Sequence, residues 1–119
     1  MASLLFQITT GPENPTKVAL GLLVAKTAAS EGHDVTVFFA GDGVQLLRDA
    51  TLDGTHGVGV GSAREHFDAL SSAGATFRAS GMSAKARGLT QEEVGDKAEL
   101  VMPTVLVGLI VESDRSVVY

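Results

Sequence analysis

The feature that most limits the fold is a long apolar helix candidate between two short strand candidates. Residues 17–29 are rich in good helix formers and too long for a strand. Before them stands the apolar run Leu4–Thr9, closed by the turn formers of residues 10–15. After them comes Val35–Ala40, which is almost entirely β-branched or aromatic and suits a strand buried on both faces of a parallel sheet. This part of the chain predicts a β-α-β unit with a right-handed crossover.

Further helix and turn signals continue the alternation along the chain. Asp42, in Gly41-Asp42-Gly43, is placed to cap a short helix over residues 44–49, and the glycine-rich residues 51–61 indicate a flexible connection. Ser62 and Glu65 form a capping-box pattern that predicts a helix to Ser72. Residues 75–79 then form a strand candidate, residues 80–88 a loop that leads into a helix, and residues 90–93 a second capping-box pattern.

Composition limits the classes of function. The chain has 119 residues, which predicts a single domain over residues 1–119, and its net charge of −5 argues against nucleic acid and anionic membranes as partners. It has no cysteine, so disulfides and thiolate metal sites are excluded. The N-terminus has no basic leader, and no apolar run reaches the roughly 18 residues of a membrane span. We therefore expect a cytoplasmic protein.

The helix candidate at residues 17–29 also bears on assembly. Its polar residues are Lys17, Lys26 and Thr27, so apolar side chains surround most of its circumference. A helix that is apolar all round is buried on more than one side, and a sheet covers only one of them. We expect a second subunit to cover the other side, and the alternative is that neighbouring helices of the same chain do so.

Polar residues gather in three loops that should meet at the carboxyl edge of the sheet, where open α/β sheets bind ligands. Asn14 follows the first strand, Asp42 follows the second, and Ser80 and Ser83 follow the third. The last loop also starts a helix, whose N–H groups could hold a small anion or metabolite. The alternative is that these side chains only satisfy loop and helix-end donors. The predicted ligand-binding set is Asn14, Asp42, Ser80, Gly81, Met82, Ser83, Lys85 and Arg87.

The residues give little support to catalysis, a metal or a cofactor. A nucleophilic serine needs a base within hydrogen-bond reach. Nothing in the sequence brings His33, His56 or His66 to Ser80, and the three show no metal-ligand spacing. We expect His66 to lie on a helix surface. Residues 57–62 lack the lysine of a P-loop and do not follow a good strand, so no nucleotide site is predicted.

The decamer at residues 79–88, Ala-Ser-Gly-Met-Ser-Ala-Lys-Ala-Arg-Gly, resembles the signature of the DsrE/DsrF-like family of small sulfur-relay proteins. Active members of that family carry a cysteine at the position of Ser80, followed at the same spacing by the Arg-Gly of Arg87 and Gly88. The resemblance extends from Asn14 and Lys17 through residues 35–43 to Glu112–Arg115. Because persulfide chemistry needs a thiolate, this chain cannot perform the family's best-known reaction.

The resemblance implies a three-layer α/β/α fold with a five-stranded, mainly parallel sheet. Local patterns leave residues 103–113 open between strand and helix, and the resemblance favours a helix there, followed by a short strand at residues 115–118. Family members usually form trimers or hexamers, so the resemblance also implies a homo-oligomer.

Three hypotheses for function follow. The first is a non-catalytic homo-oligomer that binds a small anion or metabolite near Ser80 at a subunit boundary. The second is an accessory subunit of sulfur transfer that uses a partner's cysteine, and the third is an assembly scaffold without a ligand.

Overall fold

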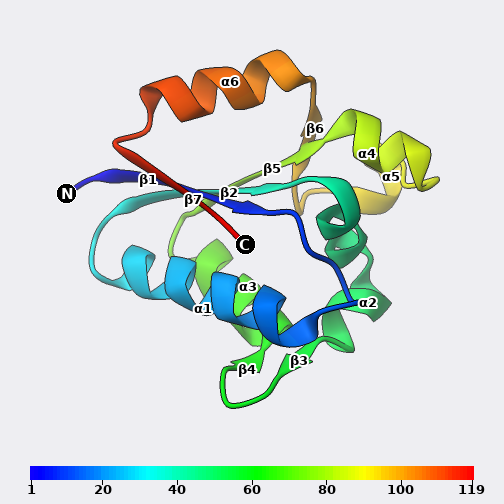
Figure 1. Ribbon diagram of the computed structural model, residues 1–119, viewed down its shortest axis with the longest axis horizontal. Coiled ribbons are helices and arrows are strands. Elements are labelled where there is room, and N and C mark those ends of the chain that lie inside the picture. The colour runs from blue at the N-terminus through cyan, green and yellow to red at the C-terminus, as the bar shows by residue number, and fades with distance from the viewer.

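The computed structural model describes all 119 residues and has a five-stranded sheet between two layers of helices (Figure 1). The strand order is β6-β5-β2-β1-β7, and every neighbouring pair is parallel. This confirms the predicted α/β fold class. The strands are β1 (Ser3–Ile8), β2 (Asp34–Phe39), β5 (Thr76–Ser80), β6 (Glu99–Val101) and β7 (Arg115–Val118).

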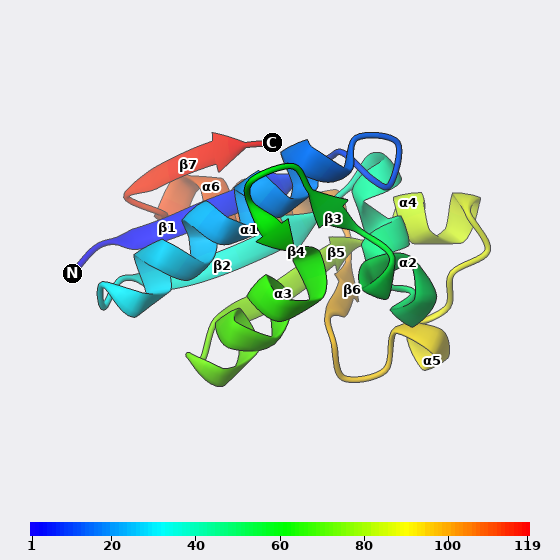
Figure 2. The ribbon, with the colours of Figure 1, turned by 90° about the horizontal axis from the view of Figure 1, so that it is seen from below.

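The two faces of the sheet are covered unequally. Helices α1 (Pro15–Ser30) and α3 (Ala63–Ser72) lie on one face, and α6 (Pro103–Glu112) alone lies on the other (Figures 1 and 2). The shorter elements lie at the carboxyl edge of the sheet or beside α1. They are the 3₁₀ helix η1 (Gly41–Leu47), α2 (Asp49–Asp53), the hairpin β3 (His56–Gly57) and β4 (Gly61–Ser62), α4 (Gly81–Ala86) and α5 (Gln91–Val94).

Strand register explains why most of the core lies on the α1 and α3 side. The register of β1, β2 and β5 places Phe6, Val37 and Phe77 side by side, and all three belong to the large core cluster on the α1 and α3 side. Side chains alternate between the two faces along a strand. The alternate residues point towards α6, where Leu5 and Phe38 are buried with Val101. This second cluster is much smaller, and α6 adds only Leu106 and Leu109 to it.

Helix α1 is covered mostly by its own chain. Val18 and Leu22 are fully buried, and a Cβ at Gly21 would lie 2.9 Å from the ring of Tyr119. Only Leu20 and Val24, exposed by 38% and 37%, remain as large apolar side chains on its outer surface. Intrachain packing therefore accounts for most of the apolar circumference.

Several local predictions are confirmed. Ser62 and Thr90 cap α3 and α5 by accepting hydrogen bonds from the N–H groups of Glu65 and Glu93. The resemblance-based prediction at the C-terminus is also confirmed, because Pro103–Glu112 is a helix and Arg115–Val118 is a strand.

Other local predictions are wrong. Asp42 lies inside a 3₁₀ helix and caps nothing, because its side chain binds an arginine instead. Residues 51–61 contain the end of α2 and the β3–β4 hairpin rather than a flexible connection. His66 is 6% exposed and not on the surface, because it packs under that hairpin. None of the helices has the length and hydropathy needed to cross a membrane.

Candidate functional site

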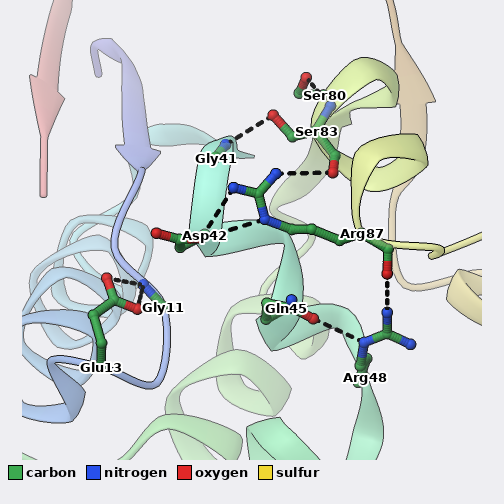
Figure 3. Close-up of polar contacts among 9 residues, drawn as sticks. All are labelled: Gly11, Glu13, Gly41, Asp42, Gln45, Arg48, Ser80, Ser83 and Arg87. Atoms are coloured by element: carbon green, nitrogen blue, oxygen red, sulfur yellow. Dashed lines mark hydrogen bonds and ion pairs between the residues drawn. The ribbon is translucent and has the colours of Figure 1, made fainter.

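Two serines join β5 and β2 at the carboxyl edge of the sheet. Ser80 ends β5 and is the N-cap of α4, where its Oγ accepts a hydrogen bond from the Ser83 N–H at 3.1 Å. The Oγ of Ser83 in turn accepts from the Gly41 N–H, 2.9 Å away at the start of η1 (Figure 3). The turn after β2 is thereby fixed to the first turn of α4.

An arginine extends this connection along the same edge. Arg87 donates from Nη2 to Asp42 Oδ1 at 3.0 Å and from Nη1 to the Ser83 carbonyl oxygen at 3.1 Å (Figure 3). The carbonyl oxygen of Arg87 accepts from Arg48 Nη2 at 2.7 Å, and Arg48 also binds Gln45. One hydrogen-bond network, which we call the Ser80 network, therefore joins η1 to α4. Its side chains come from Asp42, Gln45, Arg48, Ser80, Ser83 and Arg87.

Close backbone packing holds the loop after β1 against the start of η1. A Cβ on Gly43 would overlap the carbonyl oxygen of Ile8, so only glycine fits at this position. Asn14, at the end of the same loop, caps α1 by accepting from the Lys17 N–H at 3.3 Å. The three loops meet as predicted, but the Asn14 side chain is engaged at its own helix.

The predicted site residues therefore fall into two groups. Asp42, Ser80, Ser83 and Arg87 are brought together by the Ser80 network. Lys85 and Met82 are exposed on α4, and Gly81 lies against the backbone of Val101 in β6. Sequence reasoning missed Arg48, since no pattern relates it to Arg87, 39 positions further on, and it missed Gln45, which joins the network only through Arg48.

The cavities of the protein lie elsewhere. The largest, about 640 Å³, lies between α3, β5 and the segment before β6, and Arg64 and Lys97 are among its lining residues. Arg64 binds Asp49 and Asp53 at 2.9 and 2.7 Å. The hydrogen bond from Arg64, assisted by the charge of Lys97, holds the pKa of Asp49 below its usual value, and these carboxylates raise the pKa of Arg64. Arg64 is thus occupied in joining α3 to α2, and Lys97, in the segment before β6, pairs with Asp49 at 3.4 Å.

Two of the three histidines, His33 and His66, have partners away from Ser80. His33 Nδ1 accepts from the Ala2 N–H at 3.0 Å, and His66 Nε2 lies 2.6 Å from the carbonyl oxygen of Val60. The hydrogen-bond partner of the Ser80 hydroxyl is the backbone N–H of Ser83, not a histidine. No group of three or more histidine, aspartate or glutamate side chains is arranged to hold a metal ion.

Comparison with known proteins places this arrangement in a family. The family model described as DsrE/DsrF-like matches residues 2–119. Among solved structures, the ychN protein from E. coli has a TM-score of 0.80 at 15% identity, with all of both chains covered. A conserved protein of unknown function from Bacteroides thetaiotaomicron, BT1422, has a TM-score of 0.71 at 13% identity, covering 99% of this chain and 95% of the other. No curated protein matches the sequence significantly. The chain belongs to the DsrE/DsrF-like family.

Proposed function

We propose that this protein is a DsrE-type homo-oligomer without sulfur-transfer chemistry, and that it holds a small anion or metabolite near Ser80 at a subunit boundary. The observation that carries the proposal is the exposed apolar surface of α6. The helix contains no fully buried residue, although all but Thr104 and Glu112 of its ten residues are nonpolar. A contiguous apolar surface of this kind marks an interaction site.

The serine at position 80 supports the non-catalytic part of the proposal. A hydroxyl does not supply the thiolate that accepts and passes on sulfane sulfur. Ser80 also has no histidine among its hydrogen-bond partners that would make it a nucleophile, since its Oγ accepts a backbone N–H. Its role in the fold is that of a helix cap.

The position of α6 supports a boundary near Ser80. Val101, the strand partner of Ser80, lies two residues before Pro103, the first residue of α6. Met82 and Met102, on the two sides of this junction, are each 60% exposed. A subunit that covers α6 would therefore end close to the loop at Ser80.

The charges near Ser80 support a weak anion site. The pair between Arg87 and Asp42 is partly open to water, with 27% and 59% of the side chains exposed. Such pairs contribute only about 0–1 kcal/mol, so an anion competes with a weak interaction for the Arg87 guanidinium. Lys85, exposed on the same helix, adds a second positive charge.

Thermal unfolding with increasing sulfate or phosphate tests the anion site, with chloride at matched ionic strength as the reference. We expect a melting temperature that rises with ligand concentration. Arg87→Ala should weaken this rise, whereas Asp42→Asn should strengthen it because the competing carboxylate is neutralised. Equal shifts in all three proteins, or an equal shift with chloride, would contradict the anion site and favour the scaffold.

A further inference from the structure

We infer that the cavity beside α3 binds a small organic cation, a primary amine carried on an apolar body. The cavity has a volume of about 640 Å³, within the range of about 300–1,000 Å³ that is typical of small-molecule sites. It lies between α3, β5 and the segment before β6, and none of its lining residues belongs to the Ser80 network. The inference therefore goes beyond the proposed anion site, and its tests are independent of that site.

The path of the chain explains why a cavity is present here. In the strand order β6-β5-β2-β1-β7, the strands β1, β2, β5 and β6 follow one another in one direction across the sheet. Right-handed crossovers place the connections between these strands on the same face of the sheet. Helices α1 and α3 have 16 and 10 residues, whereas α5, the helix just before β6, has only 4 (Figure 2). The surface of β5 beside α3 is therefore not covered by a helix of full length.

The apolar part of the cavity lies on the sheet and on α3. Phe77 of β5 is half-buried and lines the cavity together with Phe67 of α3, and the centroids of their stacked rings are 4.3 Å apart. Ala75 and Ala98 are the other hydrophobic residues of the lining. An aromatic or alkyl group that packs on Phe77 would remove apolar surface from water, which favours binding.

Both cations in the lining are already paired with carboxylates. Arg64 donates to Asp49 and Asp53 at 2.9 and 2.7 Å. Lys97 Nζ lies 3.4 Å from the same Asp49 Oδ1, and it donates to the carbonyl oxygen of Val94 at 3.4 Å. An anionic ligand would have to compete with these carboxylates for both cations. The cavity therefore disfavours an anion.

Two carboxylates in the lining are available to a ligand. Asp96, in the segment before β6, is exposed and its side chain has no hydrogen-bond or ion-pair partner. Asp68, on α3, has only a long contact of 3.7 Å with Arg64. The two residues come from opposite sides of the cavity, with the apolar surface of Phe77 in the lining between them. An ammonium group, charged at neutral pH like that of lysine, is attracted to both carboxylates while its apolar body covers Phe77.

Three ligands of similar shape and different charge test this chemistry. They are 2-phenylethylamine, 2-phenylethanol and 3-phenylpropionate, each titrated into the protein at neutral pH and one ionic strength and followed by the amide signals in NMR. We expect a Kd of about 1 mM for the amine, the scale for a ligand this small, and binding of the alcohol about fivefold weaker. The carboxylate should bind more weakly still. Equal binding of the three compounds, or no saturable binding of the amine, would overturn the inference.

Charge reversal at position 71 locates the site without disturbing the core. Ser71 is exposed in the lining, three residues after Asp68 on α3. Ser71→Glu and Ser71→Arg have side chains of similar reach and opposite charge, so the Kd of the amine should be about fivefold lower in the first than in the second. Far-UV circular dichroism should match the parent in both variants.

Asp96→Asn and a matched control complete the test. Asp96→Asn should raise the Kd of the amine about twofold, because it neutralises a carboxylate in the lining. Glu112→Gln removes the same charge at an exposed position at the end of α6, on the other face of the sheet, and should leave the Kd unchanged. The inference is wrong if the two Ser71 variants bind the amine equally, or if Glu112→Gln weakens binding as much as Asp96→Asn.

Discussion

Replacing Ser80 by alanine separates a structural role of this residue from a purely ligand-binding one. The Ser80 Oγ accepts the Ser83 N–H at 3.1 Å as the N-cap of α4. Loss of a serine cap typically costs about 1 kcal/mol. We expect Ser80→Ala to lower the free energy of unfolding by that amount, which corresponds to a melting temperature lower by about 4 °C for a domain of this size.

Asparagine distinguishes the cap from the hydroxyl itself. Asn caps helices as well as Ser does, so Ser80→Asn should recover most of the lost stability. Urea unfolding followed by circular dichroism measures both variants, at one protein concentration because assembly contributes to stability. Ser72→Ala, at an exposed position of α3, serves as the control and should change little. The cap assignment fails if Ser80→Ala matches the parent, or if Ser80→Asn is as unstable as Ser80→Ala.

Three further predictions concern packing, pH and chemistry. Gly43→Ala forces a Cβ into the Ile8 carbonyl oxygen and should cost about 3 kcal/mol or more in urea unfolding; a loss under about 1 kcal/mol would refute the close packing. The Ser3 N–H, 2.8 Å from Asp114 Oδ2, lowers the pKa of Asp114, so its stabilisation is complete above the unfolded pKa of about 3.9 and is lost as pH falls through the lower folded value. Asp114→Asn should therefore flatten the pH dependence of stability below about pH 4, and an unchanged acid profile would contradict this role. The parent should accept no persulfide sulfur, whereas Ser80→Cys should accept it faster than an exposed control cysteine; equal reactivity would show that position 80 is not the family's sulfur position.

Much of the fold was predictable because its signals are local. The strand at residues 35–40 is indicated by its own β-branched and aromatic side chains. Ser62 and Thr90 each cap a helix by binding a backbone N–H three residues further on. Strand β6 was not predicted from the residues, because three residues are too few to show the alternation of apolar and polar side chains in a strand. In the sheet it pairs with β5 alone. The helix at residues 103–112 came from the family resemblance, since its composition alone also suits a strand.

The site was predictable only in outline. Its location followed from the rule that loops meet at the carboxyl edge of parallel strands. Its internal bonds did not follow, because Asp42 and Arg87 are 45 residues apart and either could have faced water. The burial of His66 was missed for a related reason. It depends on the β3–β4 hairpin folding back over α3, which the glycine-rich sequence of residues 54–61 did not indicate.

The location of the apolar surface also differed from expectation. The sequence pointed to the helix at residues 17–29, where α3, the hairpin and Tyr119 now account for most of the packing. The residues left exposed lie on α6, because α6 is the only helix on its face of the sheet. The exposed apolar surface therefore lies on the opposite face of the sheet from the helix at residues 17–29.

Native mass spectrometry of the unmodified protein at micromolar concentration tests the central proposal most directly. In the proposed homo-oligomer a partner subunit covers the exposed apolar helix α6, so we expect the dominant species to have a mass several times the 12.3 kDa of one chain. A dominant species near 12.3 kDa would contradict the proposed homo-oligomer.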